Sequence, residues 1–154
     1  MPIRLDIPGS ERIDLDVLLV DVNGTLSDGG QLIDGVAERI ARIREHLDVR
    51  LLSADTFGTM AETAEALGVR GVLAAGAGDK LKQIDGLGPS RCVAIGNGAN
   101  DVEMLRVARL AIAILGPEGA SGRAIAVADV VCRTITEALD LLLDGRLLVA
   151  TLRS

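Results

Sequence analysis

Apolar and polar positions alternate strictly at the start of the chain and then give way to continuous apolar runs. Residues 3–7 alternate in this way, and residues 13–17 repeat the alternation after the turn sequence PGS at 8–10. Alternation with a period of two on both sides of a turn predicts a β-hairpin. From Val17 the run VLLVDV is apolar on both faces, which is typical of a strand buried inside a parallel sheet.

Helix-like and strand-like segments then follow one another along the rest of the chain. The helix-like segments repeat apolar residues every three or four positions, and the strand-like segments are short apolar runs. The predicted helices are 34–47 with Asp34 as its cap, one around 60–67 that ends at Gly68, one opened by Asp79, 100–105 capped by Asn100, 120–127, and one begun by Thr134. The predicted strands after the first are 49–53, 70–75, 91–97, 110–115 and 129–132. This order predicts a doubly wound, Rossmann-like parallel α/β sheet, with residues 1–154 forming one domain.

The chain is apolar again beyond the last predicted helix. Leu147, Leu148, Val149, Ala150 and Leu152 leave few polar positions there. An apolar tail favours contact with a second copy of the chain, and an open site without a cap would benefit from such a neighbour, so we expect a homo-oligomer.

The amino-acid composition mainly bears on which classes of partner the protein can bind. Of the 154 residues, 49% are apolar and 25% charged, as in folded globular proteins. The net charge of −6 opposes extensive contact with a phosphate backbone. Phe57 is the single aromatic residue, so stacking on bases is not available either. Nucleic acid is therefore not expected as a partner.

No segment is expected to enter a membrane. The mean hydropathy is +0.38, but the longest aliphatic run, at 110–115, is far shorter than the ~20 residues that a spanning helix needs. Residues 1–16 carry acids throughout and lack the apolar core of a signal peptide, so a cytoplasmic location is expected. Cys92 and Cys132 lie in separate apolar runs without CxxC spacing, which predicts two buried thiols.

Polar residues gather where the predicted strands end. The first strand ends in DVNGTL at 21–26, the second ends in Ser53, the third is followed by Lys80, and the fourth by GNGAND at 96–101. Because the carboxyl ends of parallel strands meet at one edge of a sheet, ligands of α/β proteins bind there. The sequence therefore predicts a binding site at this edge.

The residue types at this edge suit a phosphoryl group and a cation. The carboxylate of Asp21 can attack phosphorus, while hydroxyls and the ammonium of Lys80 can hold phosphoryl oxygens. Further carboxylates can bind Mg²⁺. We expect the backbone amides of Gly24 and Thr25, and the positive end of a helix beginning at Asn100, to cradle the phosphate.

The order and spacing of DVNGTL, Ser53, Lys80 and GNGANDVEML resemble the four motifs of the haloacid dehalogenase (HAD) superfamily over nearly the whole chain. The segments DVNGTLSDG, LLSADTFGT, VAIGNGANDVEML and ILGPEGA are similar to its small branch of soluble proteins related to P-type ATPases. The resemblance implies a HAD-like fold and a phosphatase that acts through an aspartyl-phosphate intermediate.

The resemblance also implies a role for each residue of the site. Asp21 is the implied nucleophile, and Lys80 offsets negative charge. The implied contacts to phosphoryl oxygens come from Gly24, Thr25, Ser53, Lys80 and Asn100. The implied ligands of Mg²⁺ are Asp21, Asn23 through its backbone carbonyl, Asn97 and Asp101.

Two asparagines depart from the pattern of the superfamily, whose phosphatases mostly carry aspartate at both positions. An aspartate in place of Asn23 would protonate the leaving group and then activate water, a role worth ~10²–10⁴-fold in rate that an amide cannot fill. Hydrolysis should therefore be slow. The related pumps carry threonine at this position, which fits a phosphoenzyme that persists. At Asn97 a carbonyl can still ligate Mg²⁺, but a full charge is lost, so metal affinity should be weak.

The spacing of the motifs leaves no room for a cap domain. Ser53 comes 32 residues after Asp21, and Lys80 comes 27 residues after Ser53. A loop, a helix and a strand already fill each interval. We therefore expect a capless protein with an open site.

Several other residues that could suggest a functional role are better explained as surface residues or incomplete motifs. Lys82 competes with Lys80 for the site, but the distance from Lys80 to the glycine at 96 matches the superfamily. His46 is expected on a solvated helix face. Surface charges are also the expected role of three arginines that could otherwise meet a substrate, namely Arg106, Arg109 and Arg123. The GAG sequence at 76–78 lacks the third glycine of a dinucleotide-binding loop.

The predicted function is that of a Mg²⁺-dependent phosphomonoester hydrolase or phosphotransferase, acting on a phosphorylated small molecule or a phosphoprotein. The two amides keep a second hypothesis open, namely a regulatory or phosphate-binding protein with the same fold and weakened catalysis. A response-regulator receiver also phosphorylates an aspartate, but there the aspartate lies on a later strand and GNGAND has no counterpart.

Overall fold

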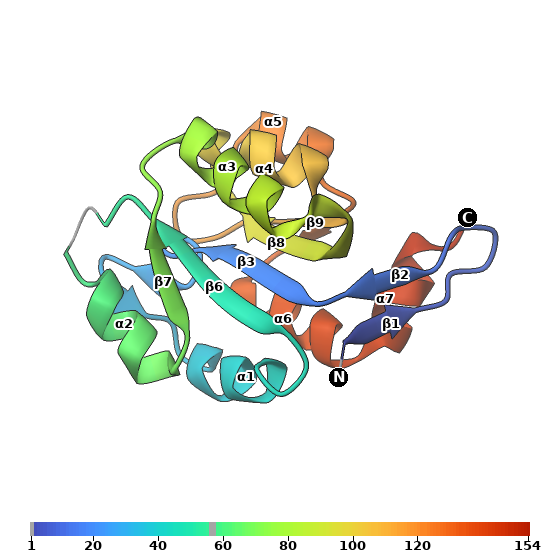
Figure 1. Cartoon of the computed structure of the whole chain (residues 1–154), viewed down its shortest axis with the longest axis horizontal. Helices are drawn as coiled ribbons and strands as arrows, with labels where there is room; N and C mark the ends of the chain where they lie inside the picture. Colours follow the sequence, from blue (N-terminus) through green and yellow to red (C-terminus); the bar gives the residue numbers. More distant parts are fainter. Residues whose placement is uncertain (1, 56–57) are drawn as a thin grey trace.

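A six-stranded parallel sheet forms the centre of the protein (Figure 1). The structure, a computed structural model, describes residues 2–55 and 58–154. The strands lie in the order β10-β9-β8-β3-β6-β7, and every neighbouring pair is parallel. Their bounds are Val17–Asp21 for β3, Asp48–Ser53 for β6, Arg70–Leu73 for β7, Cys92–Gly96 for β8, Leu110–Ile114 for β9 and Val130–Cys132 for β10. The doubly wound α/β sheet predicted from the sequence is confirmed.

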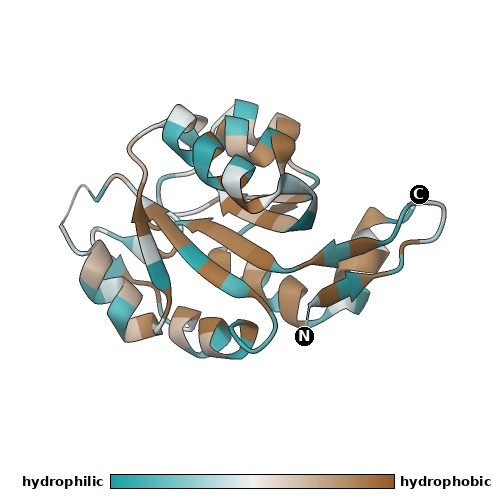
Figure 2. Ribbon diagram, in the orientation of Figure 1, coloured by the Kyte–Doolittle hydropathy of each residue, from teal (hydrophilic) through white to brown (hydrophobic). Residues whose placement is uncertain are grey.

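Helices cover both faces of the sheet, which explains the continuous apolar runs. All residues of β3, β8 and β9 are buried, and Figure 2 shows the central strands as the most hydrophobic part of the ribbon. In β3, Leu18 and Val20 point into one core, whereas Val17 and Leu19 point into the other. The first face carries α1 (Val36–Ile43), α2 (Met60–Leu67) and α6 (Ile135–Leu143), and the second carries α3 (Ala77–Leu87), α4 (Val102–Val107) and α5 (Gly122–Val127).

The strand order reverses beside β3. From β3 the chain proceeds through β6 to β7 at one edge, and then crosses to β8 on the other side of β3. The loops that follow β3 and β8 therefore diverge to opposite faces and leave a crevice at the carboxyl ends of the two strands, where α/β proteins bind ligands.

The predicted N-terminal hairpin is present. Strands β1 (Ile3–Leu5) and β2 (Ile13–Leu15) pair antiparallel, and they project from one end of the molecule (Figure 1). Helix α7 (Gly145–Leu152) packs against β1, with the side chain of Leu148 fully buried. Asp144 caps this helix by accepting a hydrogen bond from the backbone amide of Arg146.

Helix α7 corrects one prediction. The apolar residues beyond the predicted last helix are not a free tail, because they form α7 and cover the hairpin. Only Leu147 of this helix exposes a large hydrophobic side chain, at 49%. The expected self-association therefore loses one of its two grounds, keeps the open site as the other, and stays a prediction.

Helix beginnings are where the prediction is least accurate. Gly35, with φ 88°, is the N-cap of α1 in place of Asp34, since a left-handed backbone suits glycine. Helix α3 begins at Ala77, two residues before Asp79. Asn100 caps no helix, because it lies inside a short 3₁₀ turn, Ala99–Asp101. Thr134 does cap α6, by accepting from the backbone amide of Glu137.

Short segments complete the chain. The loop after β3 forms a small antiparallel pair, β4 (Ser27–Asp28) and β5 (Gln31–Leu32), and a 3₁₀ turn, Pro89–Arg91, precedes β8. In the part of the chain that the structure describes, the intervals where a cap domain would enter hold the β4–β5 pair, α1, α2 and the sheet strands β6 and β7, as expected for a capless protein. Among the described residues, no helix is long and apolar enough to cross a membrane. Cys92 and Cys132 are buried free thiols, as predicted, and burial raises the pKa of Cys132 to about 11.

Candidate active site

The carboxyl ends of β3, β6 and β8 bring the predicted site residues together. Asp21 is the last residue of β3 and Ser53 the last of β6, while Asn97 directly follows β8. Lys80 reaches the same place from the first turn of α3, and Asp101 from the 3₁₀ turn after β8. Five side chains from four separate segments therefore converge beside the point where the strand order reverses.

Lys80 joins the two buried carboxylates. Its Nζ lies 2.9 Å from Oδ1 of Asp21 and 2.6 Å from Oδ1 of Asp101. The Lys80 side chain is 1% exposed and that of Asp101 is fully buried. Lys82, two positions along α3, is exposed. The choice between the two lysines is thus decided by burial, because a buried ammonium requires such partners.

This arrangement leaves an excess of negative charge. Burial, followed by repulsion from Asp101, raises the pKa of Asp21 from 3.8 to about 6, although Lys80 acts in the opposite direction. Burial disfavours the charge on Lys80, but the two carboxylates outweigh it and raise the pKa of Lys80. The lysine therefore stays charged, and the ionised form of Asp21 is the group that gains from an added cation.

Asp101 is fully engaged by hydrogen-bond donors. Its Oδ2 accepts from the backbone amides of Asn97 at 3.0 Å and Gly98 at 2.9 Å. Its Oδ1 accepts from Lys80. These three bonds fix both the turn after β8 and the position of the lysine. A cation would have to displace one of them to reach Asp101.

Two oxygen acceptors face each other across the hydroxyl of Thr25. Its Oγ1 lies 3.2 Å from Oδ2 of Asp21 and 3.3 Å from Oδ1 of Asn97. One hydroxyl hydrogen can serve only one of these acceptors at a time. The other amide atom of Asn97, Nδ2, donates to the carbonyl of Gly119 at 3.0 Å, which leaves Oδ1 facing Thr25. A carboxylate oxygen and an amide oxygen, both of the kind that hard cations prefer, thus lie on either side of one hydroxyl.

Asn23 and Ser53 form the opposite side of the site. Nδ2 of Asn23 donates to Oγ of Ser53 over 3.4 Å. The same Oγ accepts from the backbone amide of Asp55 at 2.8 Å. Since its oxygen is used as an acceptor twice, the hydroxyl hydrogen of Ser53 is available for a ligand. Thr56 and Phe57, which belong to the LLSADTFGT segment, lie outside the described residues.

The backbone amides of Gly24 and Thr25 do not form the phosphate cradle that the sequence predicts. The amide of Gly24 donates to the carbonyl of Ser27 at 2.9 Å, and that of Thr25 donates to the carbonyl of Val22 at 3.2 Å. Both amides therefore stabilise the turn that leads into β4 instead of pointing at a ligand. Asn100 is exposed at the mouth of the site, and the helix beyond it starts only at Val102.

A cavity of about 250 Å³ opens onto Asp21. The described residues that line it are Asp21, Asn23, Ala54, Asn97, Gly98, Asn100 and Glu118. Glu118 was not predicted as a site residue. It belongs to the ILGPEGA segment, at a position between the predicted strand 110–115 and the predicted helix 120–127, so no periodic pattern placed it at the site.

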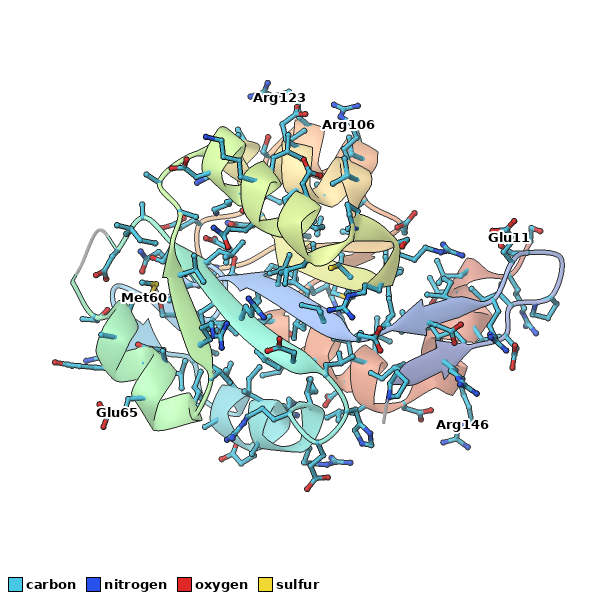
Figure 3. The ribbon with its side chains drawn as sticks, in the orientation of Figure 1. Glu11, Met60, Glu65, Arg106, Arg123 and Arg146 are labelled. Carbon is cyan, nitrogen blue, oxygen red and sulfur yellow. The ribbon has the colours of Figure 1, made fainter. Side chains whose placement is uncertain are left out.

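Other candidate residues lie elsewhere. Arg106 on α4 and Arg123 on α5 extend into solvent, as Figure 3 shows, so they are surface charges as expected. His46 is likewise exposed. Within residues 2–55 and 58–154, no three histidine, cysteine, aspartate or glutamate side chains cluster as a metal site. At the candidate site, Asn23 and Asn97 contribute amides to the cavity lining and not carboxylates.

Comparison with known proteins relates the chain to a family of hydrolases. A family model described as a haloacid dehalogenase-like hydrolase matches residues 3–109. The Uncharacterized protein MJ0073 of Methanocaldococcus jannaschii is 46% identical over 63 residues, which are 41% of this chain and 68% of that relative.

Solved structures share the fold. The 3-deoxy-D-manno-octulosonate 8-phosphate phosphatase of Moraxella catarrhalis, solved with magnesium, phosphate and KDO, matches with a TM-score of 0.69 at 22% identity, over 90% of this chain and 94% of that one. The catalytic domain of the CPx-ATPase CopB-B matches with a TM-score of 0.58 at 20% identity, over 80% of this chain and 47% of that one. At these identities the likeness concerns the fold alone.

Proposed function

The chain belongs to the haloacid dehalogenase-like hydrolase family, and from this premise we propose that it hydrolyses or transfers the phosphoryl group of a phosphomonoester through a phosphorylated Asp21. The observation that carries the proposal is the buried ion pair of Lys80 with Asp21 at the end of β3, beside the hydroxyls of Ser53 and Thr25. A carboxylate at a cavity wall with a fixed cation and hydroxyl donors around it suits attack on phosphorus.

Each residue has a defined part in the proposed reaction. Asp21 presents a carboxylate oxygen to phosphorus, and Lys80 holds that carboxylate in place by its bond to Oδ1. The hydroxyl of Ser53 donates to a phosphoryl oxygen, and the amide group of Asn23 can do the same, since both line the same side of the site. The ammonium of Lys80 offsets the charge that develops on these oxygens in the transition state.

The donors also fit a divalent cation. Oδ2 of Asp21 and Oδ1 of Asn97 would hold Mg²⁺ together with the backbone carbonyl of Asn23, because hard cations prefer oxygen ligands. When bound, the cation supplies positive charge to the phosphoryl oxygens. With a single carboxylate among these donors, the affinity for Mg²⁺ should be weak.

We do not assign Asp101 to the metal. The resemblance implies it as a ligand, but its oxygens already accept from Lys80 and from the amides of Asn97 and Gly98. Its proposed role is to position Lys80 and to order the turn that carries Asn97.

The proposed substrate is a phosphorylated small molecule or a phosphoprotein. The phosphatase of Moraxella catarrhalis, whose fold this chain shares, acts on a phosphorylated sugar acid. The intervals after β3 and β6 hold no inserted domain among the described residues. A site without a cap admits a bulky substrate or the surface of a second protein.

The two amides favour a second candidate function. Without a carboxylate at Asn23 or Asn97, the site could bind inorganic phosphate or a phosphorylated partner without turning it over. In that case the protein would act as a regulator that retains the fold of a phosphatase.

A screen of phosphomonoesters tests the two functions. The wild type and Asp21→Asn are assayed for released phosphate with Mg²⁺ and with excess EDTA, and acid-quenched samples are examined for phosphorylated aspartate. Asp85→Asn, which changes an exposed carboxylate of α3, is the matched control. We expect turnover and a phosphoenzyme in the wild type and in the control with Mg²⁺, and neither in Asp21→Asn.

Two outcomes would contradict the proposal. Undiminished turnover by Asp21→Asn would exclude Asp21 as the nucleophile. Binding of inorganic phosphate by the wild type, seen by calorimetry, without turnover of any ester would favour the regulatory function instead.

A further inference from the structure

Hydrolysis of a phosphomonoester needs a group that moves protons. One proton must reach the oxygen of the leaving alcohol, and one must be taken from the attacking water. The amides of Asn23 and Asn97 cannot perform either transfer. Lys80 is buried and committed to two carboxylates, and Asp21 is the proposed nucleophile. A side chain that carries out these transfers must therefore be another residue of the site.

Glu118 meets this need. Among the described residues that line the cavity, only Asp21 and Glu118 carry an acidic side chain. Glu118 is exposed, and no hydrogen bond or ion pair within the described part of the chain engages its carboxylate. It is consequently free to contact a substrate.

The position of Glu118 is fixed by the packing of its loop. Its carboxylate lies directly over Gly24, the neighbour of Asn23, so closely that a β-carbon at Gly24 would overlap Oε2. Gly116 packs in the same way against the carbonyl oxygen of Gly24. The two glycines thus allow the loop between β9 and α5 to lie on the turn that follows Asp21.

Hydrogen bonds to Asn97 hold the other side of the loop. The carbonyl of Gly119 accepts from Nδ2 of Asn97 at 3.0 Å, and the amide of Ser121 donates to the carbonyl of Asn97 at 2.7 Å. The amide of Gly119 also donates to the carbonyl of Gly116 at 2.9 Å, which closes a turn around Glu118. The carboxylate is therefore presented at the cavity wall by a loop that is anchored on both sides.

We propose that Glu118 is the general acid and base of this site, in the place of the carboxylate that Asn23 lacks. The inference rests on the proposed function and names a further catalytic residue for it. Glu118 is assigned to proton transfer because its exposed carboxylate lines the cavity and lies over Gly24, the neighbour of Asn23.

The two chemical steps balance as follows. In the first, a carboxylate oxygen of Asp21 bonds to phosphorus, the bond from phosphorus to the ester oxygen breaks, and protonated Glu118 gives its proton to that oxygen, which leaves as an alcohol. In the second, the Glu118 carboxylate takes a proton from water while the water oxygen bonds to phosphorus and the bond from phosphorus to Asp21 breaks. Hydrogen phosphate leaves, and Asp21 is again a carboxylate and Glu118 a carboxylic acid.

The experiment compares Glu118→Gln with Glu103→Gln, which removes an exposed carboxylate of α4 outside the cavity. Each protein is assayed with p-nitrophenyl phosphate, whose leaving group needs no proton, and with an alkyl phosphate, whose leaving group does. On the alkyl ester we expect Glu118→Gln to lose ~10²-fold in turnover, within the usual range for an acid–base group. On the nitrophenyl ester the first step should be nearly unchanged, whereas the second step lacks its base and should be slow. A burst of nitrophenolate and an accumulating phosphoenzyme are therefore expected.

A rescue experiment tests whether a carboxylate at position 23 can take over the role of Glu118. In the Glu118→Gln background, Asn23→Asp should restore turnover by a larger factor than it adds to the wild type. Glu118→Asp should retain part of the activity, since it keeps a carboxylate on a shorter side chain.

The outcomes separate the two proposals. If Glu118→Gln behaves like Glu103→Gln, or loses activity equally on both esters without a burst, Glu118 is not the acid–base group, while inactivity of Asp21→Asn still upholds the proposed function. If Asp21→Asn keeps full activity, the proposed function itself is wrong. A wild type that turns over no ester would overturn both.

Discussion

At the scale of single residues, the site is defined by what three charges do to one another. Lys80 shares its positive charge between Asp21 and Asp101, and no further cation compensates the second carboxylate among the described residues of the site. The raised pKa of Asp21, caused first by burial and then by Asp101, is the consequence. The ionised form of Asp21 is thus disfavoured by its surroundings, and a bound cation would stabilise it.

Asn23→Asp should raise turnover about tenfold or more, because it places a second group capable of proton transfer beside the nucleophile. Steady-state release of phosphate with Mg²⁺ measures the effect. Asn100→Asp is the control, since it adds the same charge at the exposed mouth of the same cavity. Equal gains in both variants would mean that added charge, and not the acid–base group, is responsible.

Asp21→Asn should stabilise the metal-free protein. The fold raises the pKa of Asp21 from 3.8 to about 6, because it favours the protonated carboxyl over the carboxylate. The contribution of this carboxyl to the free energy of unfolding is fully present below the unfolded pKa and is lost as the pH rises through about 6. Asparagine stays neutral at every pH, so the variant does not lose this contribution. Near neutral pH and above, the variant should gain up to about 3 kcal/mol in the free energy of unfolding.

Urea unfolding in EDTA at about pH 8 and about pH 4 measures this difference, which should vanish at the lower pH. Mg²⁺ should stabilise the wild type and not the variant at the higher pH. A variant that is less stable than the wild type at both pH values would show that the hydrogen bond from Thr25 and the ion pair with Lys80 outweigh the cost of burial.

At the scale of elements, the hairpin and α7 depend on each other. A two-stranded hairpin is marginally stable alone in water. Here α7 covers β1, and Leu148 is fully buried between them and the main core. Helix α7 in turn has eight residues, too few for a stable isolated helix, which needs ~12–15 residues or more.

Leu148→Ala should therefore destabilise the protein by about 2–5 kcal/mol, the usual range for a leucine removed from a core. Leu147→Ala, one position earlier and 49% exposed, is the control and should cost under about 1 kcal/mol. Denaturant unfolding of both variants gives the comparison. Equal, small effects would show that α7 does not hold the hairpin in solution.

At the scale of the whole molecule, sequence patterns gave the architecture but not the loops. Buried parallel strands are continuous apolar runs, so all six strands were predicted from the sequence. Asp21, Ser53 and Lys80 were predicted to meet at one edge of the sheet, and the structure brings them together there. The sequence did not predict that Glu118 lines the cavity, nor that the Gly24 amide donates to the carbonyl of Ser27. Both depend on how one loop packs on another, and residues 94 positions apart share no local pattern. Helix α7 was missed because its partner is the hairpin at the other end of the chain.

The hydrogen bonds in the turns after β3 and β8 also bear on how the protein ages. In flexible chains an asparagine followed by glycine deamidates, because the glycine nitrogen attacks the side-chain amide, ammonia leaves, and aspartate or isoaspartate remains. Here the backbone amide of Gly24 donates to the carbonyl of Ser27, and that of Gly98 donates to Oδ2 of Asp101, each at 2.9 Å. Neither nitrogen is therefore free to attack.

We expect Asn23 and Asn97 to survive storage of the folded protein at mildly alkaline pH and to deamidate when it is held in urea, which peptide mass spectrometry can follow. Equal conversion in both samples would show that the turns open readily. With conversion confined to unfolded chains, the two asparagines become a chemical record of the time a molecule has spent unfolded, and a molecule that refolds with aspartate at 23 would carry the carboxylate that the native site lacks.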